Sequence, residues 1–280
     1  MAKVITDNKH YTAIADALRS NSFGEIEGPM SPHEFAQRIE EISAIGQEQG
    51  RIAGYEQGVE AGKPEGIQSE YDRFWDAYQY NGTRTSYISG FAGNGWKAET
   101  FKPKYDMAVS NAYLMFSNFS YQTPISLKQI LIDCGVSLTF PKCSNIGQMF
   151  EASGITEIGE LDFSTVTRTN GTAIFNACAL LESIDKIILP NGQTTFNNWF
   201  AGCTALKSVT FEGVIGANNL NVQKSTLLSH DSLMSIINCL ADKSADTSGT
   251  TWAVTLGTTN LAKLTDAEKA IATQRGWTLA

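Results

Sequence analysis

The feature that most constrains this chain is the spacing of five phenylalanines, at positions 91, 116, 150, 175 and 200. The intervals between them are 25, 34, 25 and 25 residues, so one register with a single nine-residue insertion contains all five. Each of the last three units ends in a run typical of a strand, at 158–163, 184–189 and 209–214. A unit with one short strand cannot bury its apolar side alone, so successive units must stack. The spacing therefore predicts a short solenoid over residues 81–220.

The two clearest units share one pattern, Phe-x-x-Cys-x-x-Leu followed by Ile or Val three residues later. It runs from Phe175 to Ile184 and from Phe200 to Val209, while the preceding unit has Ser153 in place of the cysteine. The pattern resembles the leucine-rich repeats of BspA-like bacterial surface proteins, over residues 145–215 and more weakly over 85–145. This resemblance implies a leucine-rich-repeat-like solenoid. Cys178 and Cys203 occupy equivalent positions in it, which predicts small, buried, structural residues.

The remaining residues, 221–280, contain the elements of a closing unit. An amphipathic helix is expected at 227–241, a strand at 252–256 and a second helix at 265–274, which Gly276 ends. A solenoid leaves an open apolar end that requires a polar-faced cover. We therefore predict a C-terminal capping unit over residues 221–280.

Charge separates the first 80 residues from the rest of the chain. Residues 1–80 hold seven Lys/Arg and fourteen Asp/Glu, a net charge of −7, whereas residues 81–280 hold fourteen and fifteen, a net charge of −1. Dense mixed charge is typical of exposed helices. The prediction is a helical attachment module over 1–30 and a helical stalk over 31–80. The predicted fold class is thus α+β, an α-helical N-terminal module and stalk followed by the leucine-rich-repeat-like solenoid and its cap.

The predicted stalk combines an apolar seam with regularly spaced glycines. Isoleucine or valine recurs every seven residues from 45 to 59, and glycine every four residues from 46 to 66. Each glycine costs about 0.5–1 kcal/mol of helix propensity against alanine, which is reasonable where another helix approaches closely. A flexible tether is the alternative, but Ile, Val, Tyr and Ala between the glycines favour helix association. The residues predicted to mediate oligomerisation are Ile45, Gly50, Ile52, Gly54, Gly58 and Val59.

Three further segments resemble another group of proteins. Residues 11–19 with 30–32, residues 71–79 and residues 261–279 look like parts of tail-associated proteins from phages and prophages of Gram-positive bacteria. The resemblance implies a virion tail protein assembled in the host cytoplasm, with a trimer favoured. It also implies an N-terminus that contacts other tail or baseplate proteins, and a repeat domain that binds a host receptor.

Composition points to a non-enzymatic protein. The formal net charge of −8 disfavours nucleic-acid binding, and no apolar run is long enough to span a bilayer or to serve as a signal peptide. Five scattered cysteines indicate a reducing compartment without a disulfide framework, and three separated histidines offer little for catalysis. We expect no catalytic residue, metal or cofactor. Two alternatives stay open: a bacterial surface adhesin, and a glycan-cleaving enzyme whose two carboxylates meet in space.

The candidate binding surface follows from the strands. If Ile158, Ile184 and Val209 point inward, their neighbours point outward and line up between stacked units. These neighbours form a polar strip suited to hydrogen bonding with a host glycan or protein, and an ordinary solvated face is the alternative. The residues predicted to bind are Glu157, Ser183, Asp185, Ser208 and Thr210.

Oligomerisation can be tested on the full chain by light scattering. The apolar seam predicts an oligomer, and Gly54→Leu should weaken it because leucine blocks close approach, even though leucine favours an isolated helix. A parent chain that is monomeric at micromolar concentration contradicts the prediction.

Overall fold

The computed structural model describes residues 75–76, 78–79, 84–93, 97, 101–167, 171–190 and 195–280. The chain divides into two units, residues 1–84 with 102–105 and residues 85–101 with 106–280, and most of the described residues belong to the second. The six predicted oligomerisation residues lie outside the described residues, as do the predicted attachment module and all but four positions of the predicted stalk. The domain boundaries expected after residues 30, 80 and 220 stay predictions.

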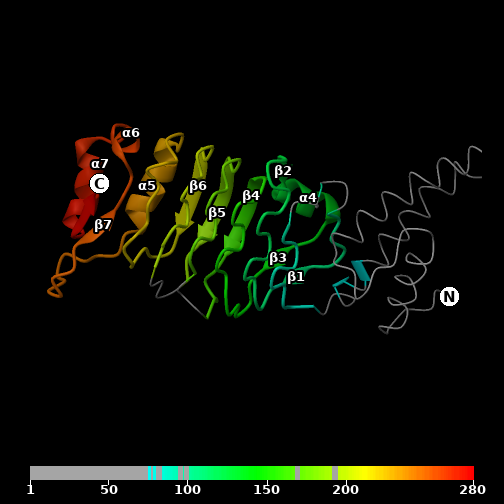
Figure 1. Cartoon of the computed structure of the whole chain (residues 1–280). Helices are drawn as coiled ribbons and strands as arrows, with labels where there is room; N and C mark the ends of the chain where they lie inside the picture. The colour runs from blue at the N-terminus through cyan, green and yellow to red at the C-terminus, as the bar shows by residue number, and fades with distance from the viewer. Residues whose placement is uncertain are drawn as a thin grey trace, which may run out of the picture. The chain divides into compact units, whose positions relative to one another are not determined.

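Every strand pair in the described part of the chain is parallel (Figure 1). The largest sheet has the order β2-β4-β5-β6, and in Figure 1 β4, β5 and β6 lie side by side in chain order. Its strands are β2 (Ile125–Ser126), β4 (Ile155–Asp162), β5 (Ser183–Ile188) and β6 (Ser208–Glu212). Two smaller sheets pair β1 (Met107–Ala108) with β3 (Leu138–Thr139) and β7 (Trp252–Val254) with β8 (Trp277–Leu279). The helices are α4 (Leu127–Cys134), α5 (His230–Cys239), α6 (Thr258–Leu261) and α7 (Asp266–Gln274).

This arrangement shows that the predicted fold class, α+β with a leucine-rich-repeat-like solenoid over 81–220, is wrong. The described residues are mostly parallel-strand sheets with few, short helices, and they contain no solenoid. The long interval between Phe116 and Phe150 holds α4 and β3. β3 pairs with β1, outside the four-stranded sheet.

The five phenylalanines of the sequence register are buried, and their rings stack in chain order. The ring centroids lie 5.2 Å apart for Phe91 and Phe116, 5.3 Å for Phe116 and Phe150, 5.4 Å for Phe150 and Phe175, and 5.3 Å for Phe175 and Phe200. The planes of the two middle pairs differ by only 6° and 4°. The register predicted from the spacing is therefore confirmed for these side chains. Ile158, Ile184 and Val209 are also buried, as expected.

The backbone around each phenylalanine explains why the rings stack. The residues two before and two after each ring have positive φ, for example +52° at Gln148 and +54° at Ala152. Because the backbone is left-handed at these two positions, three N–H groups of one turn reach carbonyl groups of the next turn. Around Phe150 these bonds are Gln148 N to Thr172 O at 2.8 Å, Phe150 N to Ile174 O at 2.8 Å and Ala152 N to Asn176 O at 2.7 Å. We call this set of bonds the turn ladder.

The two equivalent cysteines support the same turns. The thiol of Cys178 donates to Phe150 O at 2.8 Å, and that of Cys203 donates to Phe175 O at 3.0 Å. Both residues are buried, and no cysteine of the chain forms a disulfide. Their predicted structural role is confirmed.

The last strand of the large sheet is covered by α5. The hydroxyl of Ser232 accepts a hydrogen bond from Val209 N at 3.0 Å, and that of Ser235 accepts one from Phe211 N at 3.2 Å. These serines satisfy the edge groups that a further strand would otherwise pair, which protects the edge from other chains. The elements predicted for the C-terminal region are present as α5, β7 and α7, with shorter bounds. Leu227 lies outside α5 and is 54% exposed, so its assignment to the apolar face of that helix is wrong.

Removal of one ring from the stack should destabilise the protein strongly. Phe175→Ala deletes a fully buried ring between Phe150 and Phe200 and leaves a cavity, which typically costs about 3–5 kcal/mol of the free energy of unfolding. Tyr121→Ala is the control, because this aromatic side chain is 46% exposed, and its change should stay within about 0.5 kcal/mol. Urea unfolding of both variants measures the difference. Equal losses would contradict the stack.

Candidate recognition surface

The predicted binding residues lie on the outward side of the large sheet. Strand register aligns Glu157 with Ser183, and Ser183 with Ser208. Ser126 of β2 extends the alignment, since it is registered with Glu157 and its hydroxyl donates to Glu157 Oε2 at 2.7 Å. Four neighbouring strands thus present one polar side chain each. We call Ser126, Glu157, Ser183 and Ser208 the polar row.

The other two predicted residues do not join this row. A register shift between Ile184 and Ile187 leaves two residues of β5, Asp185 and Lys186, opposite the single Thr210 of β6. Asp185 turns to a different partner, Lys128 of α4, whose Nζ lies 2.8 Å from Asp185 Oδ2. The structure therefore brings together three of the five predicted residues, exposes all five at least partly, and leaves their binding role a prediction.

A groove of about 810 Å³ lies beside the polar row, between α4 and β4. Helix α4 begins at Leu127 because the Ser126 hydroxyl accepts from Gln129 N at 3.0 Å. It ends at Gly135, whose φ of +64° turns the chain toward β3. The groove is lined by α4, this turn, β3 and the β4 residues from Ile158 to Asp162. Its helical wall is therefore built from the interval that contains the nine-residue insertion.

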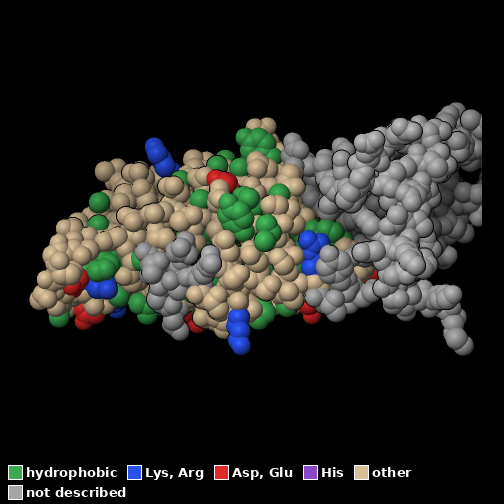
Figure 2. All heavy atoms as spheres, turned by 60° about the horizontal axis from the view of Figure 1, so that its bottom comes forward, with side chains coloured by type: hydrophobic (Ala, Val, Ile, Leu, Met, Phe, Trp, Pro, Cys, Tyr) green, Lys and Arg blue, Asp and Glu red, His purple; other side chains and the backbone are tan. Residues whose placement is uncertain are grey.

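Carboxylates dominate the charged groups around the groove. Four of its lining residues are acidic and one is basic, namely Asp106, Glu160, Asp162, Asp185 and Lys128. Asp106 accepts from Ser137 N at 2.7 Å, and this hydrogen bond lowers the pKa of its carboxyl group. The hydrogen bond that Lys128 donates to Asp185 raises the pKa of Lys128, which therefore stays charged. On the face of the molecule shown in Figure 2, most described atoms belong to the backbone or to uncharged side chains.

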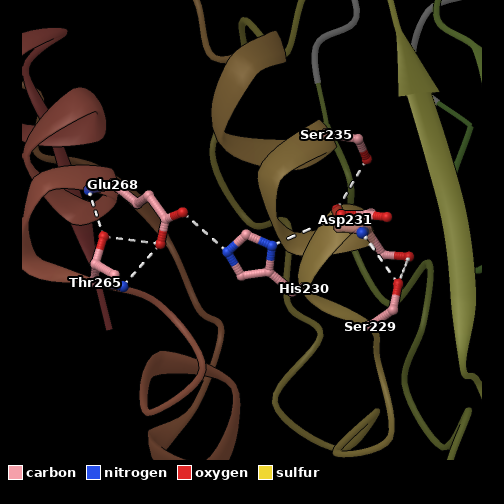
Figure 3. A network of polar contacts seen from close by, with 7 residues as sticks. Ser229, His230, Asp231, Ser235, Thr265 and Glu268 are labelled. Atoms are coloured by element: carbon pink, nitrogen blue, oxygen red, sulfur yellow. Dashed lines mark hydrogen bonds and ion pairs between the residues drawn. The ribbon is translucent and has the colours of Figure 1, made fainter.

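His230 is the strongest catalytic candidate by residue type, and its contacts argue against that role. Its Nε2 lies 2.9 Å from Glu268 Oε1, and its Nδ1 lies 3.7 Å from Asp231 Oδ1 (Figure 3). Both ring nitrogens therefore face carboxylates, and neither is directed at a hydroxyl or thiol that it could activate. The neighbouring Ser229 instead caps α5, accepting from Ser232 N at 3.2 Å. Asp231 is a first-turn acid of the same helix.

The buried thiols are also unsuited to chemistry. Burial raises the pKa of Cys178 to about 11 and that of Cys203 well above its usual value, so both are neutral at pH 7. Over the described residues, no cluster of three or more His, Cys, Asp or Glu side chains could hold a metal ion. The longest helix described, α5, has ten residues, and none in this part of the chain could cross a membrane.

Sequence reasoning missed the groove with its lining residue Lys128, and it missed Ser126 of the polar row. Both residues lie in the 34-residue interval, which was treated only as an interruption of the register. The signal available in the sequence was Ser126 followed by an apolar pattern and Gly135, which indicates a short helix with both ends marked. Its position against β4 depends on contacts between distant residues, which the pattern does not contain.

The polar network of Figure 3 gives a pH-dependent prediction. Glu268 accepts from Thr265 N at 2.8 Å within a capping box, and this bond is the main cause of its lowered pKa. A lowered pKa means that the charged carboxylate stabilises the fold above the unfolded pKa, near 4.5, and that this contribution is lost as the pH falls through the lower folded value. Glu268→Gln should therefore lower Tm at pH 7 and have little effect at pH 3.

Thermal unfolding of the parent and both variants at the two pH values provides the test. Ser229→Ala is the control, because it removes the uncharged N-cap of α5, which accepts from Ser232 N, and should cost about 1 kcal/mol at either pH. If Glu268→Gln lowers Tm equally at pH 3 and pH 7, the carboxylate charge is not responsible.

No protein-family model, no curated protein and no solved structure matches this chain. The resemblances to BspA-like repeats and to phage tail proteins therefore depend on the sequence segments named above. Its function has to follow from the chemistry of its own residues.

Proposed function

We propose that this chain is a non-enzymatic structural and receptor-binding component of a phage tail or tail-like particle. The polar row, presented by four adjacent strands beside the groove, is the observation that carries the proposal. Hydroxyl and carboxylate groups at regular strand spacing can hydrogen-bond an extended ligand at several points. Ser126 and Glu157 of the row are followed directly in the chain by Leu127 and Ile158, which line the groove, so the row borders the groove.

The chemistry of the described residues favours binding over catalysis. Exposed carboxylates on and next to the sheet are engaged in ion pairs. Lys186 Nζ lies 3.3 Å from Glu160 Oε2 and 3.1 Å from Glu212 Oε2. Lys207 Nζ lies 2.6 Å from Oε2 of Glu182, the residue before β5. These carboxylates are held by lysine ammonium groups, an arrangement that suits recognition and does not place them as a proton donor for glycan cleavage.

Attachment and oligomerisation complete the proposed function. In the proposal, residues 1–80 contact other tail or baseplate proteins and associate the chains, with a trimer favoured. Several copies of the row then act together, so weak binding at each site becomes strong attachment through avidity. The proposed location is the virion tail, and the proposed ligand is a host surface glycan or protein.

Cell binding by the purified full chain tests the proposal. Labelled protein should bind cells of at least one strain in a panel of Gram-positive bacteria. Ser183→Trp with Ser208→Trp should reduce that binding at least about tenfold, because the indoles block the centre of the polar row. Both positions are at least partly exposed, so the fold should persist.

Thr273→Trp is the matched control, since it places the same ring on the exposed side of α7 and should leave binding unchanged. Circular dichroism and Tm establish that all variants are folded. Binding by the row variant at the parent level, or no binding to any strain by the parent, contradicts the proposal.

A further inference from the structure

The groove between α4 and β4 has an aliphatic wall that is open to solvent. Ile132 of α4 is 61% exposed, the largest exposed fraction among the large hydrophobic side chains that the structure describes. Leu131, Val136 and Leu138 continue this wall and are partly buried. Covering such surface releases about 25 cal/mol for each Å² of apolar area, so an apolar side chain placed here gains binding free energy.

The opposite wall leaves room for a ligand because β4 has a glycine at its centre. A Cβ atom built on Gly159 has only one neighbouring atom within 4 Å, Lys128 Cγ at 4.0 Å. The backbone of this residue does not need the left-handed conformation that favours glycine. A side chain at position 159 would therefore be tolerated by the strand and would fill the groove.

The rim of the groove is more negative than the chain around it. Residues 81–280 contain fifteen acids and fourteen bases, yet the groove has four acids and one base. Lys128 is paired with Asp185 at 2.8 Å and Glu160 with Lys186 at 3.3 Å, so among the described residues Asp106 and Asp162 are the rim acids without an ion pair. Carboxylates at the edge of an apolar hollow attract cationic groups and select the sign of the ligand.

Two other occupants fit these observations less well. A sugar ring usually stacks on an exposed aromatic face. The groove's only aromatic lining residue, Phe140, is 2% exposed, and its ring centroid lies 5.0 Å from that of Phe163. The chain's own residues 1–80 carry a net charge of −7 and would be repelled by the rim.

We infer that the groove binds a polypeptide segment of a partner protein that combines lysine or arginine with aliphatic side chains. The aliphatic groups lie against α4, and the cationic groups reach Glu160, Asp162 and Asp185. The inference rests on the proposed function and deepens it, since it makes the recognised host component a protein with a basic, apolar segment.

Calorimetry with two synthetic peptides tests the charge and the apolar requirement together. The probe is acetyl-Gly-Leu-Lys-Leu-Lys-Gly-amide, and its partner has glutamate in place of both lysines. The full chain should bind the lysine peptide at least about tenfold more tightly than the glutamate peptide. The difference should shrink as salt is added, because the rim carboxylates are exposed and screened.

Variants of the chain locate the site. Gly159→Phe should abolish binding by filling the groove, and Ile132→Ser should weaken it by removing the exposed apolar group. Glu160→Gln with Asp162→Asn should weaken binding of the lysine peptide at least about fivefold. Asp231→Asn is the control, since this exposed acid lies on α5, outside the residues that line the groove. Tm values establish that each variant is folded.

The outcomes separate this inference from the proposed function. If the parent binds cells and neither peptide, or if Gly159→Phe binds the lysine peptide as the parent does, the inference is overturned and the proposed function stands. Tight binding of the glutamate peptide overturns it as well. If the lysine peptide binds in the groove but the parent binds no cells, the groove chemistry is supported and the proposed function fails.

Discussion

The turn ladder is the interaction on which the rest of this structure depends. The turns around Phe91, Phe116, Phe150 and Phe175 each donate three N–H groups to the next turn, and the positive φ values on both sides of the ring make this possible. The ladder sets the distance between turns at the spacing that stacks the rings, 5.2–5.4 Å between centroids. The ladder therefore pairs the amides of the buried residues Phe91, Phe116, Phe150 and Phe175, which avoids the cost of burying an unpaired N–H group there. In addition, the thiols of Cys178 and Cys203 donate hydrogen bonds to the backbone carbonyls of Phe150 and Phe175.

The surface features follow from where this order is interrupted. The nine-residue insertion between Phe116 and Phe150 places α4 beside β4, so the sheet borders a groove there instead of continuing evenly. The register shift in β5 has a similar effect, because it turns Asp185 out of the polar row and toward Lys128. At the other edge, the α5 serines end the sheet. A regular core therefore supports an irregular, chemically distinct surface, which is the usual division of labour between scaffold and binding site.

Periodic features of the sequence predicted the interior well. The 25-residue spacing identified the stacked phenylalanines, the two equivalent cysteines, and the inward-facing Ile158, Ile184 and Val209. It did so because equivalent positions of successive units are buried in the same way. Local signals also identified α5, β7 and α7. The fold class and the groove could not be predicted, since the division into three sheets depends on β3 pairing with β1 across about 30 residues. Leu227 was assigned to a helix by periodicity alone, whereas the Ser229 cap starts α5 later.

Native-state hydrogen exchange at the phenylalanine amides tests the turn ladder most directly. The amides of Phe116, Phe150 and Phe175 each donate to the following turn, at 2.6, 2.8 and 3.0 Å. They should exchange only through global unfolding, with a common free energy equal to that of the whole domain. Amides in the exposed loop at 247–251 should exchange through local opening at much lower free energy. If the three phenylalanine amides exchange as fast as that loop, the ladder does not hold the turns together.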